Sequence, residues 1–408
     1  MRLIIAATIM FALLMGVSFA QVPSGLSIKD ARTQAYKSSP TILAARARLE
    51  GATARRRGAG ALGSPILSIA KGLGNNTGGL DEDILLTQTV EIGDKRRFRV
   101  QAASGEEKSA IQDLKQAELE TSASVTQAYY EAQLSDSELG LAKENQDNAK
   151  VFATAAETQF KAGDVAKSNL LRSQIELTRA EQAVIAAQTE RDNKFAALAN
   201  AIGLTSSNNL KLSDALQYNP TTHRVDEWKT AAIKRRADLA ASRYTQESRN
   251  AAARIARSAG QPDLFVEGRH SSLDPSNGGT SVRFGITLPL LDFGRMKADT
   301  RSAQASAKEQ GALILGLQRQ VDLEVETNFR NVMQARKSVE SFQGGRLDRS
   351  KQLLEMAQIG YQKGANSFLE LLDAQQINRS EQIDYLRAIA AYNIASNALE
   401  RAAGGPLP

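Results

Sequence analysis

Side chains that could do chemistry are scarce in this chain of 408 residues. It has no cysteine, its only histidines are His223 and His270, and it carries no nucleophile-elbow, zinc-protease or phosphate-loop motif. A metal site built from thiolates or several imidazoles therefore cannot form within one copy, and Met296, Met333 and Met356 are too far apart for a thioether site. We expect no enzymatic activity, no cofactor and no resident metal.

One acidic pair has a spacing that could matter. Glu370 and Asp373 lie three positions apart in a stretch that should be helical, so their carboxylates share one helix face. Charged side chains at this spacing are usually just solvated. What this pair can do depends on the elements that position it.

The overall charge argues against nucleic acid as a partner. The formal net charge is +6, and acidic and basic residues are interspersed along the sequence. We interpret the charged residues as solvated helix faces.

The first twenty residues are typical of a cleavable signal peptide. Arg2 is followed by an apolar run from Leu3 to Val17, and cleavage after Ala20 would fit the small residues there. An uncleaved anchor is the alternative, although the run is shorter than the roughly 20 residues that a spanning helix needs. Later stretches are too polar to cross a bilayer as helices, so any membrane contact must come from strands or an amphipathic surface.

The rest of the chain is organised as a tandem duplication. Gly93 and Gly163 bound a run of about seventy residues without proline, and Gly294 and Gly364 bound a second run 201 residues later. As a helix, each run would be roughly 100 Å long, a length found in coiled coils and helical tubes.

The duplication predicts the same order of elements in each half: a helix, a β-hairpin, a long helix and a return helix. The first repeat should span 21–210, with its hairpin at 65–91, its long helix at 94–160 and its return helix at 165–201. A connector at 211–224 should lead to the second repeat at 225–408, with a helix at about 225–259, a hairpin at 263–290, a long helix at 294–359 and a return helix at 367–403.

The hairpins predict a membrane barrel shared between chains. In the last strand, Val282, Phe284, Ile286 and Leu288 alternate with polar or small residues, so one face is apolar. Four strands cannot close a barrel alone, which predicts an oligomer. A small water-soluble sheet that caps the helices is the alternative. Candidate aromatic residues for the membrane interface are Phe265, Phe284 and Phe293.

This plan resembles the TolC-like outer membrane factor family over essentially the whole chain after the signal. Two local motifs carry the resemblance, residues 286–294 at the last strand and helix start and residues 361–374 at the second helix turn. Residues 88–96 are similar to the CzcC-like branch that serves cation-efflux pumps. A plainer interpretation of this third segment is that Gly93 makes a tight junction and that Lys95, Arg96 and Arg97 lie near anionic lipid headgroups.

The resemblance implies a mainly α-helical fold with a small β part. Three copies would form a 12-stranded transmembrane β-barrel, with four strands per chain, and a long α-helical barrel through the periplasm. The implied function is a passive exit duct in the outer membrane of a Gram-negative bacterium. Its partners would be outer membrane lipid, a periplasmic adaptor (membrane fusion protein) and an inner-membrane pump of the RND type, and its cargo would be heavy-metal cations. The same duct could instead serve drug efflux or type I protein secretion, and a periplasmic coiled-coil adaptor or structural protein is a further alternative.

The resemblance also assigns roles to residues at the two helix turns. Adaptor-contacting tips would be formed by Phe160, Ala162, Gly163, Asp164, Val165, Tyr361, Lys363, Gly364 and Ala365. A channel gate at the periplasmic entrance would be formed by Ser168, Asn169, Tyr361, Asn366, Glu370 and Asp373. In a trimer, Glu370 and Asp373 would make two rings of carboxylates that raise the local cation concentration. Asn366 stands where relatives can carry arginine, so at that point only a hydrogen bond is available.

Overall fold

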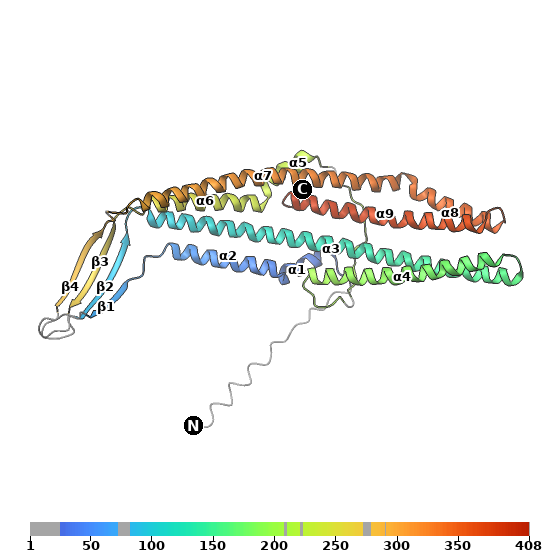
Figure 1. Ribbon diagram of the computed structural model, residues 1–408, viewed down its shortest axis with the longest axis horizontal. Coiled ribbons are helices and arrows are strands. Elements are labelled where there is room, and N and C mark those ends of the chain that lie inside the picture. Colours follow the sequence, from blue (N-terminus) through green and yellow to red (C-terminus); the bar gives the residue numbers. More distant parts are fainter. Residues whose placement is uncertain are drawn as a thin grey trace, which may run out of the picture.

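The computed structural model describes residues 25–71, 82–207, 210–220, 223–271, 279–289 and 291–407. These residues form an elongated layer of helices with a four-stranded antiparallel sheet at one end (Figure 1). The expected signal peptide at 1–20 and both hairpin turns lie largely outside the described residues. No helix among the described ranges is long and apolar enough to cross a membrane.

The first half is dominated by one uninterrupted helix. Its elements are α1 (Ile28–Ser38), α2 (Pro40–Ala59), β1 (Ile66–Lys71), β2 (Glu82–Glu91), α3 (Lys95–Ala162) and α4 (Lys167–Ala201). The chain has no proline between Pro65 and Pro220, so nothing removes a helical hydrogen bond over the 68 residues of α3. Pro40 occupies the first turn of α2, where its missing N–H costs nothing.

The second half has the same order of elements but its helices are divided. They are α5 (Val225–Arg235), α6 (Ala237–Ser258), β3 (Asp263–Ser271), β4 (Gly279–Thr287), α7 (Arg295–Ser341), a π-helical turn η1 (Phe342–Arg346), α8 (Leu347–Gln362) and α9 (Phe368–Ala402). The prediction of one continuous helix over 225–259 is therefore wrong, and so is that of one over 294–359.

Each interruption has a local cause. Gly344 and Gly345 have non-helical backbone angles, and the φ of +94° at Gly345 is one that glycine adopts readily. Between α5 and α6, Arg236 is extended and its guanidinium bonds Asp238, Glu324 on α7 and the Ala402 carbonyl at the end of α9. This corner between α5 and α6 is thus held by contacts between distant parts of the chain.

The strands pair in sequence order, each antiparallel to the next. The register aligns Leu67 with Leu86, Val266 with Phe284 and Leu264 with Ile286, and these side chains are exposed on one face. The opposite face is mainly polar and carries the ion pair between Arg283 and Glu267, with 2.9 Å between Arg283 Nε and Glu267 Oε1. The predicted alternation of β4 is confirmed, and β1 and β4 leave two open sheet edges.

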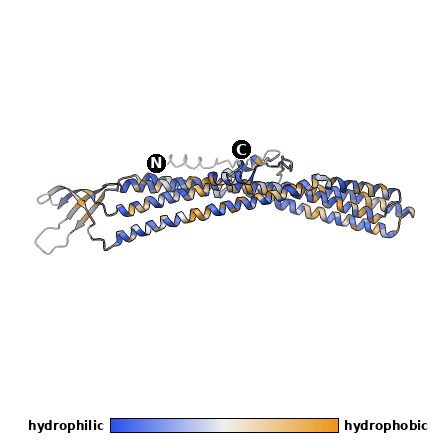
Figure 2. Cartoon of the chain, turned by 90° about the horizontal axis from the view of Figure 1, so that it is seen from above, coloured by the Kyte–Doolittle hydropathy of each residue, from blue (hydrophilic) through white to orange (hydrophobic). Residues whose placement is uncertain are grey.

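The helices form a single curved layer. α3 lies between α2 and α4 on one side and α6 and α9 on the other, and α7 and α8 form the far edge (Figure 1). Two apolar clusters sit near the middle of its length, one around Tyr129 and Leu198 and one around Trp228 and Tyr392. Apolar and polar residues are mixed along the helices, as Figure 2 shows. The buried apolar residues of the described helices therefore form separate clusters along the layer.

Candidate functional site

The far end of the layer from the sheet is formed by two helical hairpins. At the first hairpin, α3 ends in Gly163 with a φ of +85°, and the Asp164 amide donates to the Gln159 carbonyl at 2.9 Å. Lys161 pairs with Glu157 at 2.7 Å, and this hydrogen bond and charge lower the pKa of Glu157. Phe160 is left exposed beside the turn.

The second hairpin repeats this geometry 201 residues later. Gly364 has a φ of +73°, and the Ala365 amide donates to the Gly360 carbonyl at 2.8 Å. The Asn366 side chain folds over Gly360, where an added Cβ would lie 2.5 Å from Asn366 Cγ. The Asn366 side chain therefore packs against Gly360 across the turn, and a side chain at residue 360 would displace it.

Glu370 has a defined structural task at the start of α9. Its carboxylate accepts from the Ser367 amide at 2.7 Å, while the Ser367 hydroxyl accepts from the Glu370 amide at 3.3 Å. This reciprocal capping box satisfies two N–H groups that the helix leaves free. Asp373 is exposed one turn further along. The two carboxylates share a helix face as expected, but one of them is already engaged.

The two hairpins touch near their tips through Tyr361. Its hydroxyl donates to Gln159 Oε1 on α3 at 3.4 Å, and its ring stacks at a tilt on Phe368, with 5.7 Å between centroids. Phe152 on α3 packs against the small apolar cluster of Ala357, Leu371 and Ala374 at the same place. Further along, Arg387 Nε on α9 donates to Glu138 on α3 at 2.7 Å.

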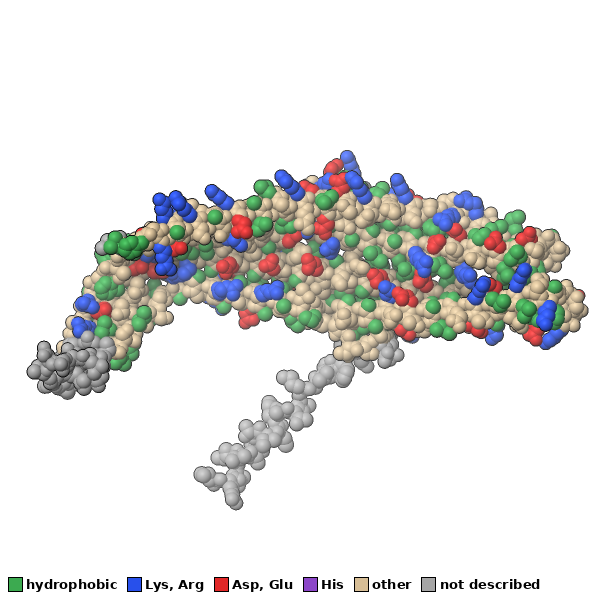
Figure 3. All heavy atoms as spheres, viewed as in Figure 1, with side chains coloured by type: hydrophobic (Ala, Val, Ile, Leu, Met, Phe, Trp, Pro, Cys, Tyr) green, Lys and Arg blue, Asp and Glu red, His purple; other side chains and the backbone are tan. Residues whose placement is uncertain are grey.

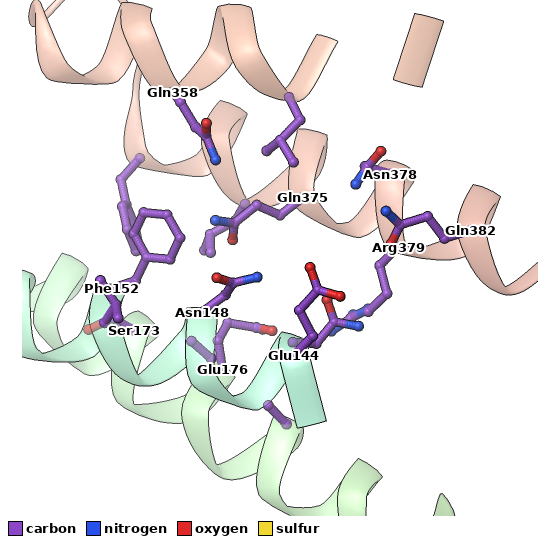
Figure 4. A pocket seen from close by; sticks show the side chains of 17 residues that line it. Glu144, Asn148, Phe152, Ser173, Glu176, Gln358, Gln375, Asn378, Arg379 and Gln382 are labelled. Carbon is purple, nitrogen blue, oxygen red and sulfur yellow. The ribbon is translucent and has the colours of Figure 1, made fainter. Parts of the chain in front are cut away.

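A cleft of about 250 Å³ separates the hairpins between these two points of contact (Figure 4). Asn148 and Glu144 of α3 and Ser173 and Glu176 of α4 face it from one side. From the other side come Gln358 of α8 and residues of α9, which are Gln375, Asn378, Arg379 and Gln382. Because amide and charged side chains make up about half of the lining, water can fill the cleft, and the hairpins are joined mainly at its ends.

The structure distributes the predicted gate and tip residues over both hairpin ends. It brings Tyr361 into contact with the first hairpin, whereas Ser168 and Asn169 lie at the start of α4 and Asn366, Glu370 and Asp373 lie around the second turn. Their roles as gate or adaptor contacts stay predictions. Gln159, Phe152 and the Glu138–Arg387 pair were not foreseen, because long helices offer no sequence signal for which polar residues face another hairpin.

The sequence also matches the profile of a known protein family. The sequence profile of the outer membrane efflux protein family matches residues 31–204 and 228–405. The chain belongs to this family. The predicted resemblance to TolC-like outer membrane factors is thereby confirmed, and the two matched stretches each contain one hairpin tip.

Individual relatives agree with this assignment. This outer membrane efflux protein is 25% identical to the cobalt-zinc-cadmium resistance protein CzcC of Cupriavidus metallidurans over 322 residues, which cover 77% of this chain and 75% of CzcC. Its fold is similar to that of the outer membrane protein VceC of Vibrio cholerae, with a TM-score of 0.76, 20% identity and coverage of 93% and 96%. The MtrE outer membrane channel of Neisseria gonorrhoeae gives a TM-score of 0.76 at 17% identity, with coverage of 93% and 89%.

Proposed function

We propose that three copies of this outer membrane efflux protein form the passive exit duct of a tripartite efflux system. The sheets would join into a 12-stranded barrel through the outer membrane, and the helical layers would close into a tube in the periplasm. An adaptor would contact the hairpin tips, and an inner-membrane pump of the RND type would supply the energy. This chain itself does no chemistry in the proposed system.

The observation that carries this proposal is the four-stranded sheet. One of its faces is apolar and exposed, its other face is mainly polar, and β1 and β4 leave unpaired edges. Unpaired edges in a membrane are costly, and joining each β4 to the β1 of a neighbouring copy would remove them. Three such sheets contain an even number of strands, as bacterial barrels do.

The edges of the helical layer support the same arrangement. Exposed apolar residues occur on α4 at one edge, including Ile175 and Ile185, and on α7 and α8 at the other, including Leu323 and Met356. An interface between two different edges of identical chains generates a ring when the rotation closes. The thin layer would then become the wall of a tube.

Heavy-metal cations are the cargo that we propose. The support is the similarity to CzcC, which is named for cobalt, zinc and cadmium resistance, together with the motif at residues 88–96. No cluster of metal-ligating side chains occurs within the described residues. We therefore place metal selectivity in the pump and give the duct only the carboxylates near its entrance, Glu370 and Asp373.

Resistance measurements test this function. A strain that lacks the protein should become sensitive to divalent metals, and the wild-type gene should restore resistance. Sensitivity to drugs alone would contradict the metal cargo and leave the duct. Monomers rather than heat-resistant trimers in the outer membrane fraction would contradict the duct itself.

A further inference from the structure

Four segments of the chain meet where the helices adjoin the sheet. They are residues 55–63 at the end of α2, 91–101 at the start of α3, 254–263 at the end of α6 and 291–301 at the start of α7; we call this region the junction. Arg96 Nε donates to the Gly60 carbonyl at 2.7 Å, and Lys95 Nζ donates to the Gln261 carbonyl at 2.7 Å. A Cβ on Gly260 would lie 3.0 Å from Met296 Sδ. The four segments therefore form one continuous surface.

The positive charge of the protein is concentrated at the junction. Its four segments contain twelve Lys and Arg residues and five Asp and Glu residues, a net charge of +7, while the whole chain has +6. The remainder of the chain is thus close to neutral. Figure 3 shows Lys and Arg side chains on the helices next to the sheet and also further along this face of the molecule.

Part of this charge is neutralised, both inside the junction and by Glu106 and Glu107 of α3 just outside it, and part is exposed. Lys95 Nζ lies 2.9 Å from both carboxylate oxygens of the largely buried Asp263. Arg97 and Arg295, in contrast, reach Asp94 and Asp299 only at 3.4 and 3.9 Å in exposed pairs, which screen little charge. A set of exposed cations faces solvent, namely Arg57, Arg97, Arg295, Lys297 and Arg301.

Exposed apolar side chains lie beside these cations. Phe293 is 96% exposed and Leu291 is 79% exposed, in the short segment between β4 and α7. Phe293 also has a φ of +50°, which a bulky side chain rarely adopts. The Asp292 carboxylate holds this turn by accepting from the Gly294 amide at 3.2 Å and the Met296 amide at 2.8 Å. A strained, fully exposed phenylalanine indicates a contact that one isolated copy lacks.

The order of these residues matches the depth profile of a membrane. The apolar face of β4, with Phe284 and Ile286, leads to Leu291 and Phe293, and the exposed cations follow in the first turns of α7. Acyl chains, the interface and then phosphates follow one another in the same order in a leaflet.

We propose that the junction binds the phosphate groups of anionic glycerophospholipids, with Phe293 and Leu291 inserted among their acyl chains. This inference rests on the barrel of the proposed function. The helices leave the sheet on the periplasmic side, so the lipids belong to the inner leaflet of the outer membrane. Lipopolysaccharide phosphates would lie at the opposite end of the strands.

Native mass spectrometry of the full-length protein in detergent tests this proposal, with phosphatidylglycerol as probe and phosphatidylethanolamine as comparison. The quadruple variant Arg57→Gln, Arg97→Gln, Arg295→Gln and Lys297→Gln should bind phosphatidylglycerol at least about ten-fold more weakly, because each cation near a lipid surface contributes attraction. The matched control neutralises four exposed lysines along the helices, Lys143→Gln, Lys150→Gln, Lys308→Gln and Lys337→Gln. It should bind like wild type, and circular dichroism melting of both variants checks that they fold.

A second variant tests whether Phe293 contacts lipid or a neighbouring copy of the protein. Phe293→Asn removes the apolar ring, and asparagine tolerates a positive φ. It should weaken retention of phosphatidylglycerol and leave the oligomer intact by light scattering. Loss of the oligomer with unchanged lipid binding would overturn the proposal and assign Phe293 to a subunit interface.

Three further results would also overturn it: equal binding of both phospholipids, equal loss in the lysine control, or a preference for lipopolysaccharide. None of these results would contradict the proposed duct function, because that function is tested separately by channel conductance in planar bilayers. Conversely, a protein that binds phosphatidylglycerol selectively but shows no conductance would contradict the proposed duct function and not the lipid site.

Discussion

The contact between the two hairpin tips gives the sharpest test of the proposed gate. Tyr361→Phe removes the hydroxyl that donates to Gln159 Oε1 at 3.4 Å and keeps the ring on Phe368. A neutral hydrogen bond of this length is worth about 0.5 kcal/mol. Three copies in a trimer would contribute about 1.5 kcal/mol, and about 1.4 kcal/mol changes an equilibrium constant ten-fold.

We therefore expect Tyr361→Phe to raise the open probability of single channels in planar bilayers about ten-fold. Gln159→Leu should have the same effect, and the double variant should add little, because both changes remove one interaction. Tyr244→Phe, on α6 away from the tips, is the matched control. Unchanged opening in Tyr361→Phe, or fully additive effects of the two variants, would show that this hydrogen bond does not hold the channel closed.

Three further predictions follow from the turns and the corner of the fold. Gly364→Val forces a β-branched residue to a φ of +73° at a cost of about 1–2 kcal/mol, so it should abolish export while trimers persist on gels. The control Gly316→Ala, inside α7, should be active. An active Gly364→Val protein would contradict the assignment of Gly364 to the adaptor-contacting tip. Glu370→Gln and Asp373→Asn should each lower cation selectivity of reconstituted channels about two-fold while the capping box survives, and unchanged selectivity in both would contradict the carboxylate rings. Arg236→Met should destabilise the fold by about 3 kcal/mol in thermal melts, because it leaves Asp238 without its ion partner and Glu324 with Arg401 alone. A loss below about 1 kcal/mol would contradict this explanation.

The same corner predicts a pH dependence. Burial opposes ionisation of Asp238, but hydrogen bonds and charge from Arg236 outweigh it and hold the pKa of Asp238 below the ordinary value of 3.8. A lowered folded pKa means that the carboxylate contributes stability above the unfolded pKa, and that this contribution is lost as pH falls through the folded value. Melting temperature should therefore drop more steeply below pH 3.8 in wild type than in Asp238→Asn. Parallel acid profiles of the two proteins would contradict the pairing.

Much of the helical plan could be predicted because it depends on local chemistry. Gly93, Gly163, Gly294 and Gly364 all have positive φ, as expected of tight turns, and Gly203 and Gly404 add a third pair with the same spacing of 201 residues. The breaks at Arg236 and Gly345 were missed. A glycine pair within a helix is often tolerated, and nothing near Arg236 in sequence reveals its partners Glu324 and Ala402.

The basic residues near Gly93 have partners within the protein that the sequence does not reveal. Gly93 makes the tight turn that was expected, with a φ of +75°. Lys95 and Arg96 bind Asp263 and the Gly60 carbonyl within the junction, and their proximity to headgroups stays a prediction. Arg97 does face outward, together with charges from other positions such as Arg57 and Lys297. Interspersed charge in the sequence thus becomes concentrated charge in the fold.

Most helices, turns and strands of this protein could be predicted from local sequence. Absent prolines, repeated glycines and alternating apolar residues act over a few neighbouring positions, so they specify long helices, their turns and an amphipathic sheet. The Tyr361–Gln159 contact, the cleft between the hairpins and the basic junction arise from tertiary packing instead. These features join residues that lie tens to hundreds of positions apart, and the angle at which one long helix faces another is set by packing along its whole length.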